Sequence, residues 1–187
     1  MDRREAVQYI ALLLGGTVVG SNAFITGCKT KADKKAFSQE DIAYLDEIAE
    51  TILPATRTPG AKAAKVGAFI PIMINDCYVE KDQESFHKGM ETINELSEEA
   101  YDKSFMEITP AQRHELLVKI DKESKDYTRN KKPEDPNHYF RLMKEVTLLG
   151  YFTSEVGCKQ GRRYDHVPGR YEACVPYTKG EGAWTTW

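Results

Sequence analysis

The sequence lacks the features by which most cofactor-binding and membrane-spanning proteins are recognised. It contains no Cys-x-x-Cys-His haem-attachment motif, no glycine-rich turn after a strand pattern, and no pair of cysteines at zinc-binding spacing. Its longest apolar stretch, residues 9–20, is shorter than the roughly 20 residues that span a membrane comfortably. Only four cysteines and four histidines occur in 187 residues. We therefore expect no catalytic residue, bound cofactor or metal in this chain.

An excess of charge of one sign is also missing. The chain has 26 basic and 29 acidic residues, a net charge of -3, and the two signs are interleaved. The densest basic stretch, residues 29–35, is most simply interpreted as part of a solvated linker. A nucleic-acid-binding surface is therefore not predicted.

Residues 1–27 have the three parts of an export signal: arginines, an apolar stretch, and small residues before a cleavage point. Arg3 and Arg4 are typical of a twin-arginine signal, which exports folded proteins, although an ordinary basic signal start is the alternative. Residues 25–28 resemble a bacterial lipobox, which predicts lipidation of Cys28; the alternative is a plain cysteine. The expected location is the periplasmic side of a bacterial membrane, with a lipid anchor.

After a polar linker over residues 28–37, residues 38–187 are predicted to form a single all-α domain. We expect about five helices in a small, bundle-like, orthogonal packing. Capping-box patterns at Ser38 and Thr109 each predict a helix start. Helices are also predicted from about residue 61, with Cys77 on the inner face, and over residues 83–103. At Pro71 either the first of these helices is kinked or two short helices meet. The charged segment 122–136 is predicted to be a loop.

The most apolar segment of the domain, residues 139–157, is predicted to be its central helix. The apolar residues on one side recur at helical spacing: Phe140, Met143, Val146, Leu149 and Phe152. Others, such as Leu142 and Tyr151, lie around the rest of the helix. This distribution predicts a helix that is buried on more than one face.

Residues 158–187 are predicted to be an irregular aromatic tail, because glycines and prolines interrupt any helix. The tail is too apolar to be disordered, so it packs on its own helices, docks on a partner, or does both. The candidate docking residues are Tyr164, Tyr171, Tyr177, Trp184 and Trp187. If Cys28 is lipidated, three cysteines remain, and the candidates are a Cys158–Cys174 disulfide or a bond to another chain.

Four segments resemble the gluconate 2-dehydrogenase subunit 3 family: residues 51–64 (TILPATRTPGAKAA), 76–78 (DCY), 140–155 (FRLMKEVTLLGYFTSE) and 163–171 (RYDHVPGRY). The resemblance runs from about Phe37 to the C-terminus. It implies a small, non-catalytic subunit of a membrane-associated sugar or polyol dehydrogenase. The implied partners are a flavoprotein large subunit that holds FAD and, in some complexes, a multihaem cytochrome c subunit. The small subunit would help the flavoprotein to mature and would supply the twin-arginine signal for its export.

Two other hypotheses compete with this one. A free-standing periplasmic lipoprotein, acting as a ligand-binding or scaffolding module, would have its tail packed on itself and no exposed apolar patch. An enzyme would need a reactive pair, for which Asp165 and His166 are the best candidates. Adjacent residues seldom converge on one ligand, so the accessory-subunit hypothesis is preferred.

Overall fold

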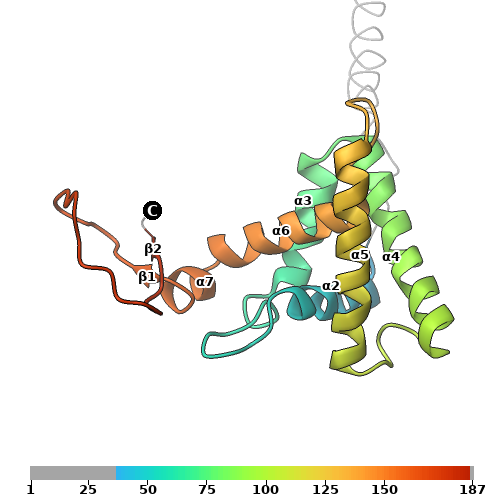
Figure 1. Cartoon of the computed structure of the whole chain (residues 1–187), viewed down its shortest axis with the longest axis horizontal. Helices are drawn as coiled ribbons and strands as arrows, with labels where there is room; N and C mark the ends of the chain where they lie inside the picture. The colour runs from blue at the N-terminus through green and yellow to red at the C-terminus, as the bar shows by residue number, and fades with distance from the viewer. Residues whose placement is uncertain (1–36, 186–187) are drawn as a thin grey trace, which may run out of the picture. The chain divides into compact units, whose positions relative to one another are not determined.

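The computed structural model describes residues 37–185, which form six helices and one pair of short strands (Figure 1). The elements in chain order are α2 (Gln39–Ile52), α3 (Val66–Cys77), α4 (Glu80–Tyr101), α5 (Pro110–Asn130), α6 (Tyr139–Thr153), α7 (Glu155–Lys159), β1 (Arg163–Tyr164) and β2 (Trp184–Thr185). The predicted all-α fold is confirmed. Arg3, Arg4, Cys28 and Trp187 lie outside the described residues.

The two predicted capping boxes start α2 and α5. The Ser38 hydroxyl accepts from the Asp41 amide at 3.1 Å, and the Asp41 carboxylate accepts from the Ser38 amide at 2.8 Å. Thr109 and Gln112 make the same reciprocal pair at the start of α5. Each box satisfies amide groups that a helix start otherwise leaves without a partner.

Helix α6 is the element on which the others pack. It contacts α2, α3, α4 and α5, and it runs across α5 in Figure 1. Leu142, Met143, Val146 and Thr147 are completely buried. Leu149, which was predicted to lie on the inner side, is instead 41% exposed. The buried residues of α6 therefore form one wide side, and Leu149 lies beyond its edge.

Two glycines allow neighbouring side chains to approach the helix backbones closely. A Cβ atom on Gly89 of α4 would lie 2.3 Å from the Cβ atom of Tyr139, and one on Gly150 of α6 would lie 2.7 Å from Phe69. Side-chain atoms do not approach this closely without displacement. These two positions therefore set how tightly α4 and α3 pack against α6.

The connection from α5 to α6 is held by a buried carboxylate. Asp82, which is 5% exposed, accepts from the Asn137 amide at 2.7 Å and from its side-chain Nδ2 at 3.0 Å. Next to Asn137, His138 caps α6: its Nδ1 accepts from the Phe140 amide at 3.2 Å, and its ring stacks on Tyr139. Because a protonated Nδ1 cannot accept, this cap requires neutral histidine.

Three expectations about α3 and α5 are wrong. Segment 122–136 is helical as far as Asn130, because Leu117, Ile120 and Ser124 continue a buried stripe and Lys125 pairs with Asp121 one turn earlier. The second helix begins at Val66 rather than near residue 61. Its Pro71 lies within the helix, and Cys77 is exposed instead of facing inward.

The predicted helix over residues 139–157 is divided at Ser154. The Ser154 hydroxyl accepts from the Gly157 amide at 3.0 Å and so caps the separate helix α7. A Cβ atom at Gly157 would lie 1.9 Å from the Tyr151 carbonyl oxygen, so only glycine fits this turn. Within residues 37–185, no helix is both long and apolar enough to cross a membrane.

We predict that acid destabilises the fold through His138. Burial lowers the pKa of His138, and the Glu123 carboxylate 4.0 Å away opposes this only in part. The unfolded chain therefore binds the proton more readily, and stability falls as the pH drops through about 6.5. Urea unfolding at pH 7.5 and 5.5 should show a smaller loss for His138→Asn, which keeps a capping side chain. His114→Asn, at an exposed position of α5, is the matched control. An undiminished loss in His138→Asn would contradict the assignment.

Gly89→Ala is predicted to lower the free energy of unfolding by about 2 kcal/mol, because the new methyl group overlaps the Tyr139 side chain. Helix propensity alone would favour alanine by about 1 kcal/mol, so the sign of the change is informative. Denaturant unfolding followed by circular dichroism measures it. Gly182→Ala, where the nearest atom is 3.6 Å from the added Cβ, should be close to neutral. A stabilised Gly89→Ala variant would show that the close approach is not a constraint.

Candidate functional site

The tail forms a loop that is closed at its base by β1 and β2. The two strands are parallel, with Arg163 opposite Trp184 and Tyr164 opposite Thr185. The Arg163 amide donates to the Ala183 carbonyl at 2.9 Å, and the Asp165 amide donates to the Thr185 carbonyl at 3.1 Å. Residues 165–183 between the strands are called the tail loop below. In Figure 1 the tail loop extends from the end of α7.

Two arginines reinforce the base of the tail loop. The Arg163 guanidinium carbon lies 3.9 Å from the centre of the Trp184 ring, and the guanidinium also pairs with Glu181. The Arg162 guanidinium carbon lies 4.2 Å from the centre of the Phe152 ring on α6. Arginine stacks well on aromatic rings because its planar cation is weakly hydrated. The base is therefore attached to the end of α6.

The tail loop carries apolar side chains that its own helices do not cover. Tyr171 is 91% exposed and Tyr177 is 83% exposed, and Val167 and Val175 are also exposed. Exposed aromatic residues on a closed loop are suited to bind another protein, because tyrosine offers a large contact area with few rotatable bonds. The tail loop therefore exposes these apolar side chains to solvent, where another protein could cover them.

The predicted docking residues fall into two groups. Tyr171 and Tyr177 lie on the exposed part of the tail loop. Tyr164 and Trp184 lie in the strands at the base: the Tyr164 hydroxyl is 2.8 Å from His166 Nδ1, and Trp184 covers Arg163. Tyr164 and Trp184 thus hold the base of the loop, whereas Tyr171 and Tyr177 are exposed on it.

The cysteines Cys77, Cys158 and Cys174 are free thiols in the structure. Cys158 is buried in α7, where its thiol donates to the Phe152 carbonyl at 3.2 Å, whereas Cys174 is exposed on the tail loop. The Cys158–Cys174 bridge is therefore not formed in this structure, and the pairing stays a prediction.

A second ordered loop, residues 53–65 between α2 and α3, is attached to the same end of α6. The Glu50 carboxylate accepts from the amides of Ala55 and Lys62, at 2.9 and 2.8 Å. The Tyr151 hydroxyl of α6 donates to the Pro59 carbonyl at 2.7 Å. Loop 53–65 is thus held against the end of α6, with Arg57 exposed.

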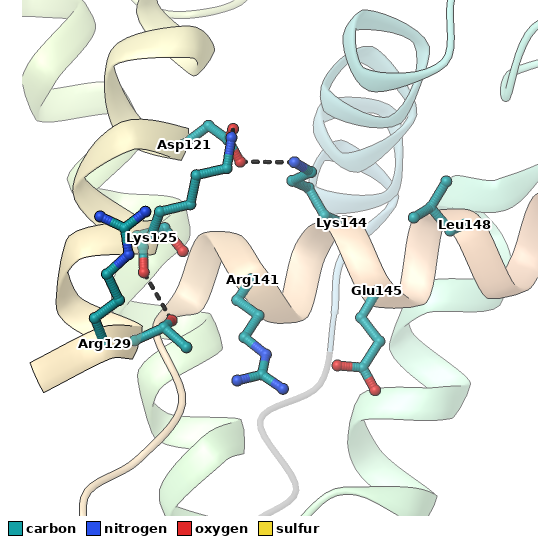
Figure 2. Close-up of a pocket in the computed structure, with 9 residues that line it drawn as sticks. Asp121, Lys125, Arg129, Arg141, Lys144, Glu145 and Leu148 are labelled. Atoms are coloured by element: carbon teal, nitrogen blue, oxygen red, sulfur yellow. Dashed lines mark hydrogen bonds and ion pairs between the residues drawn. The ribbon is translucent and has the colours of Figure 1, made fainter. Parts of the chain in front are cut away.

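A groove of about 440 Å³ lies between α5 and α6 (Figure 2). Its lining consists mainly of charged and hydroxyl side chains: Asp121, Ser124, Lys125, Thr128, Arg129, Arg141, Lys144, Glu145 and Leu148. Lys125 and Lys144 both bind the Asp121 carboxylate at 2.6 Å. Partial burial acts to raise the pKa of Asp121, but the two lysines outweigh it and hold the pKa below its ordinary value. Sequence reasoning missed this groove because it assigned four of the nine lining residues to a loop.

The Asp165–His166 pair does not form a reactive arrangement with other groups. The Asp165 carboxylate accepts from the Val167 amide at 3.2 Å, and His166 contacts Tyr164. Within the described residues 37–185, no three His, Cys, Asp or Glu side chains are grouped so as to hold a metal ion.

The family comparison covers most of this structure. A family model described as gluconate 2-dehydrogenase subunit 3 matches residues 39–169, from the start of α2 into the tail loop. No curated protein and no solved structure matches the chain. The matched range includes the loop 53–65, helix α6 and strand β1, and it ends before Tyr171. The chain therefore belongs to the gluconate 2-dehydrogenase subunit 3 family.

Proposed function

We propose that this chain is a non-catalytic accessory subunit that binds a flavin-dependent sugar or gluconate-type dehydrogenase, helps it to mature and escorts it out of the cytoplasm. Membership of a family of dehydrogenase subunits supports the class of partner. The observation that carries the proposal is the closed tail loop with its exposed tyrosines. In this proposal FAD, and haem c where a cytochrome subunit is present, belong to the partners.

The closed base favours docking because it limits the entropy that the tail loop loses on binding. A free segment of this length would have to order many residues when it meets a partner. The strand pair and the stacking of Arg163 on Trp184 order the ends of the segment beforehand. Tyr171 and Tyr177 can then enter a complementary groove on the dehydrogenase.

The export part of the proposal uses residues before the described range. Arg3 and Arg4 would direct the chain, together with its folded partner, to twin-arginine export. Cys28 would carry the lipid that holds the complex on the periplasmic side of the membrane, with the partner as the other possible attachment. The escort role explains why a subunit without a cofactor of its own would carry a signal for folded proteins.

The alternative, a free-standing lipoprotein, requires a tail that packs on its own helices. The exposure of Tyr171 and Tyr177 instead leaves apolar surface for another molecule, which favours the accessory subunit.

Tyr171→Ala combined with Tyr177→Ala is predicted to weaken binding to the dehydrogenase at least tenfold, because truncating aromatic anchors typically costs more than 1 kcal/mol. The melting temperature should hardly change, because both side chains are exposed. Co-purification of the tagged chain with the co-expressed flavoprotein partner measures the effect. Val118→Ala, an exposed apolar position on α5, is the control. Undiminished co-purification of the double variant would argue against docking through the tail loop.

Arg3→Lys combined with Arg4→Lys is predicted to leave both this chain and its flavoprotein in the cytoplasm, because twin-arginine export depends on the arginine pair. Cell fractionation with an assay of dehydrogenase activity in each fraction measures this. The reverse exchange, Lys31→Arg combined with Lys35→Arg in the linker, should leave export normal. Export of an active flavoprotein without this chain would refute the escort role.

A further inference from the structure

We propose that the groove between α5 and α6 binds an acidic polypeptide segment, through Arg129 and Arg141 together with the paired lysines Lys125 and Lys144. This would be a second binding surface, separate from the tail loop. It does not depend on the identity of the dehydrogenase, and it is carried by the charge and geometry of the groove.

The first observation is an excess of positive charge in the groove. Four cations line it, Lys125, Arg129, Arg141 and Lys144, against the two carboxylates of Asp121 and Glu145. The chain as a whole has a net charge of -3, so the excess is local. One carboxylate, Asp121, is shared by two lysines, and it therefore leaves part of their charge uncompensated.

The second observation is that the two arginines are poorly satisfied. Arg141 is exposed, and no residue within 37–185 makes a hydrogen bond or an ion pair with its guanidinium. Arg129 reaches only Asp126, at 3.4 Å, and both of these side chains are exposed, so the pair contributes little. A guanidinium offers paired donors that match a carboxylate. Both arginines are thus available to an incoming anionic group.

The third observation is the way in which the cations are distributed. Lys125 and Arg129 are one turn apart on α5, and Arg141 and Lys144 are one turn apart on α6. Figure 2 shows Arg141 and Glu145 extending from the same side of α6, while Arg129 lies across from them on α5. A single small anion could contact only part of this set. An extended chain with successive carboxylates can contact both rows, which favours an acidic polypeptide.

The pairing of Asp121 with Lys125 and Lys144 also organises the groove in advance. The Lys144–Asp121 pair joins α6 to α5 across the groove, the Lys125–Asp121 pair lies along α5, and together they fix the two ammonium groups at 2.6 Å from one carboxylate. The two lysine side chains are therefore already ordered before the ligand binds, so they lose less conformational entropy on binding. Leu148, at one end of the lining, adds an apolar contact.

Binding of a fluorescein-labelled oligoglutamate peptide to the full chain, followed by fluorescence anisotropy, tests the proposal. Arg129→Gln with Arg141→Gln should weaken binding about tenfold and flatten its dependence on salt, because two charged contacts are lost. Glu145→Gln should strengthen binding about threefold, because it removes a repelling charge. A gain of affinity cannot result from misfolding. Arg57→Gln, which removes one exposed positive charge from loop 53–65, should have no effect.

Three results would overturn the proposal. One is the absence of saturable oligoglutamate binding, and another is a loss of affinity in Arg57→Gln equal to that of the groove variants. The third is displacement of the peptide by inorganic phosphate at equal concentration, which would identify the groove as a site for free anions. Co-purification with the flavoprotein is a separate measurement. Failure of the groove and failure of the accessory role can therefore be told apart.

Discussion

The wide buried side of α6 is the constraint on which the rest of the structure depends. Leu142, Met143 and Val146 can leave water only if several helices cover them at once, and α2, α3, α4 and α5 do so. Gly89 and Gly150 allow two of these neighbours to approach closely. The remaining side of α6 is left to solvent, and it carries Arg141 and Glu145. One helix thus supplies both the core and one wall of the charged groove.

Local signals in the sequence were sufficient to predict part of this fold. Ser38 and Thr109 predicted helix starts because a capping box depends only on residues three apart. The assignment of Leu149 to the inner side was wrong for a geometric reason. Residues spaced by three drift about 60° around a helix at each step, so the series that begins at Phe140 has left the buried side by Leu149. Segment 122–136 was misassigned because its charges suggested a loop, whereas part of that charge is paired along the helix, Lys125 with Asp121 and Arg129 with Asp126.

The candidate sites were less accessible to sequence reasoning, because they depend on contacts between distant residues. The aromatic composition of the tail indicated a binding segment, but nothing local indicated that Arg163 would pair with Trp184. The groove arises from the crossing of α5 and α6, and four cations that are scattered in the sequence meet only there. Tyr151 has a similar role, since its hydroxyl holds Pro59 from a loop that precedes it by 92 residues. The end of α6 is therefore a junction between two loops that the sequence presents as unrelated.

The pairing of β1 with β2 also determines which part of the molecule unfolds first. Strands of two residues each hold the whole tail loop closed, and their few hydrogen bonds oppose the entropy of the intervening chain. The helices are held by a continuous buried cluster to which the tail loop contributes nothing. We therefore expect amide hydrogen exchange at the base of the loop to proceed by local opening, at a much lower free energy than exchange in α6. The tail loop and the helical bundle are then expected to unfold as two cooperative units, so that changes in the loop can alter recognition without altering the melting of the bundle.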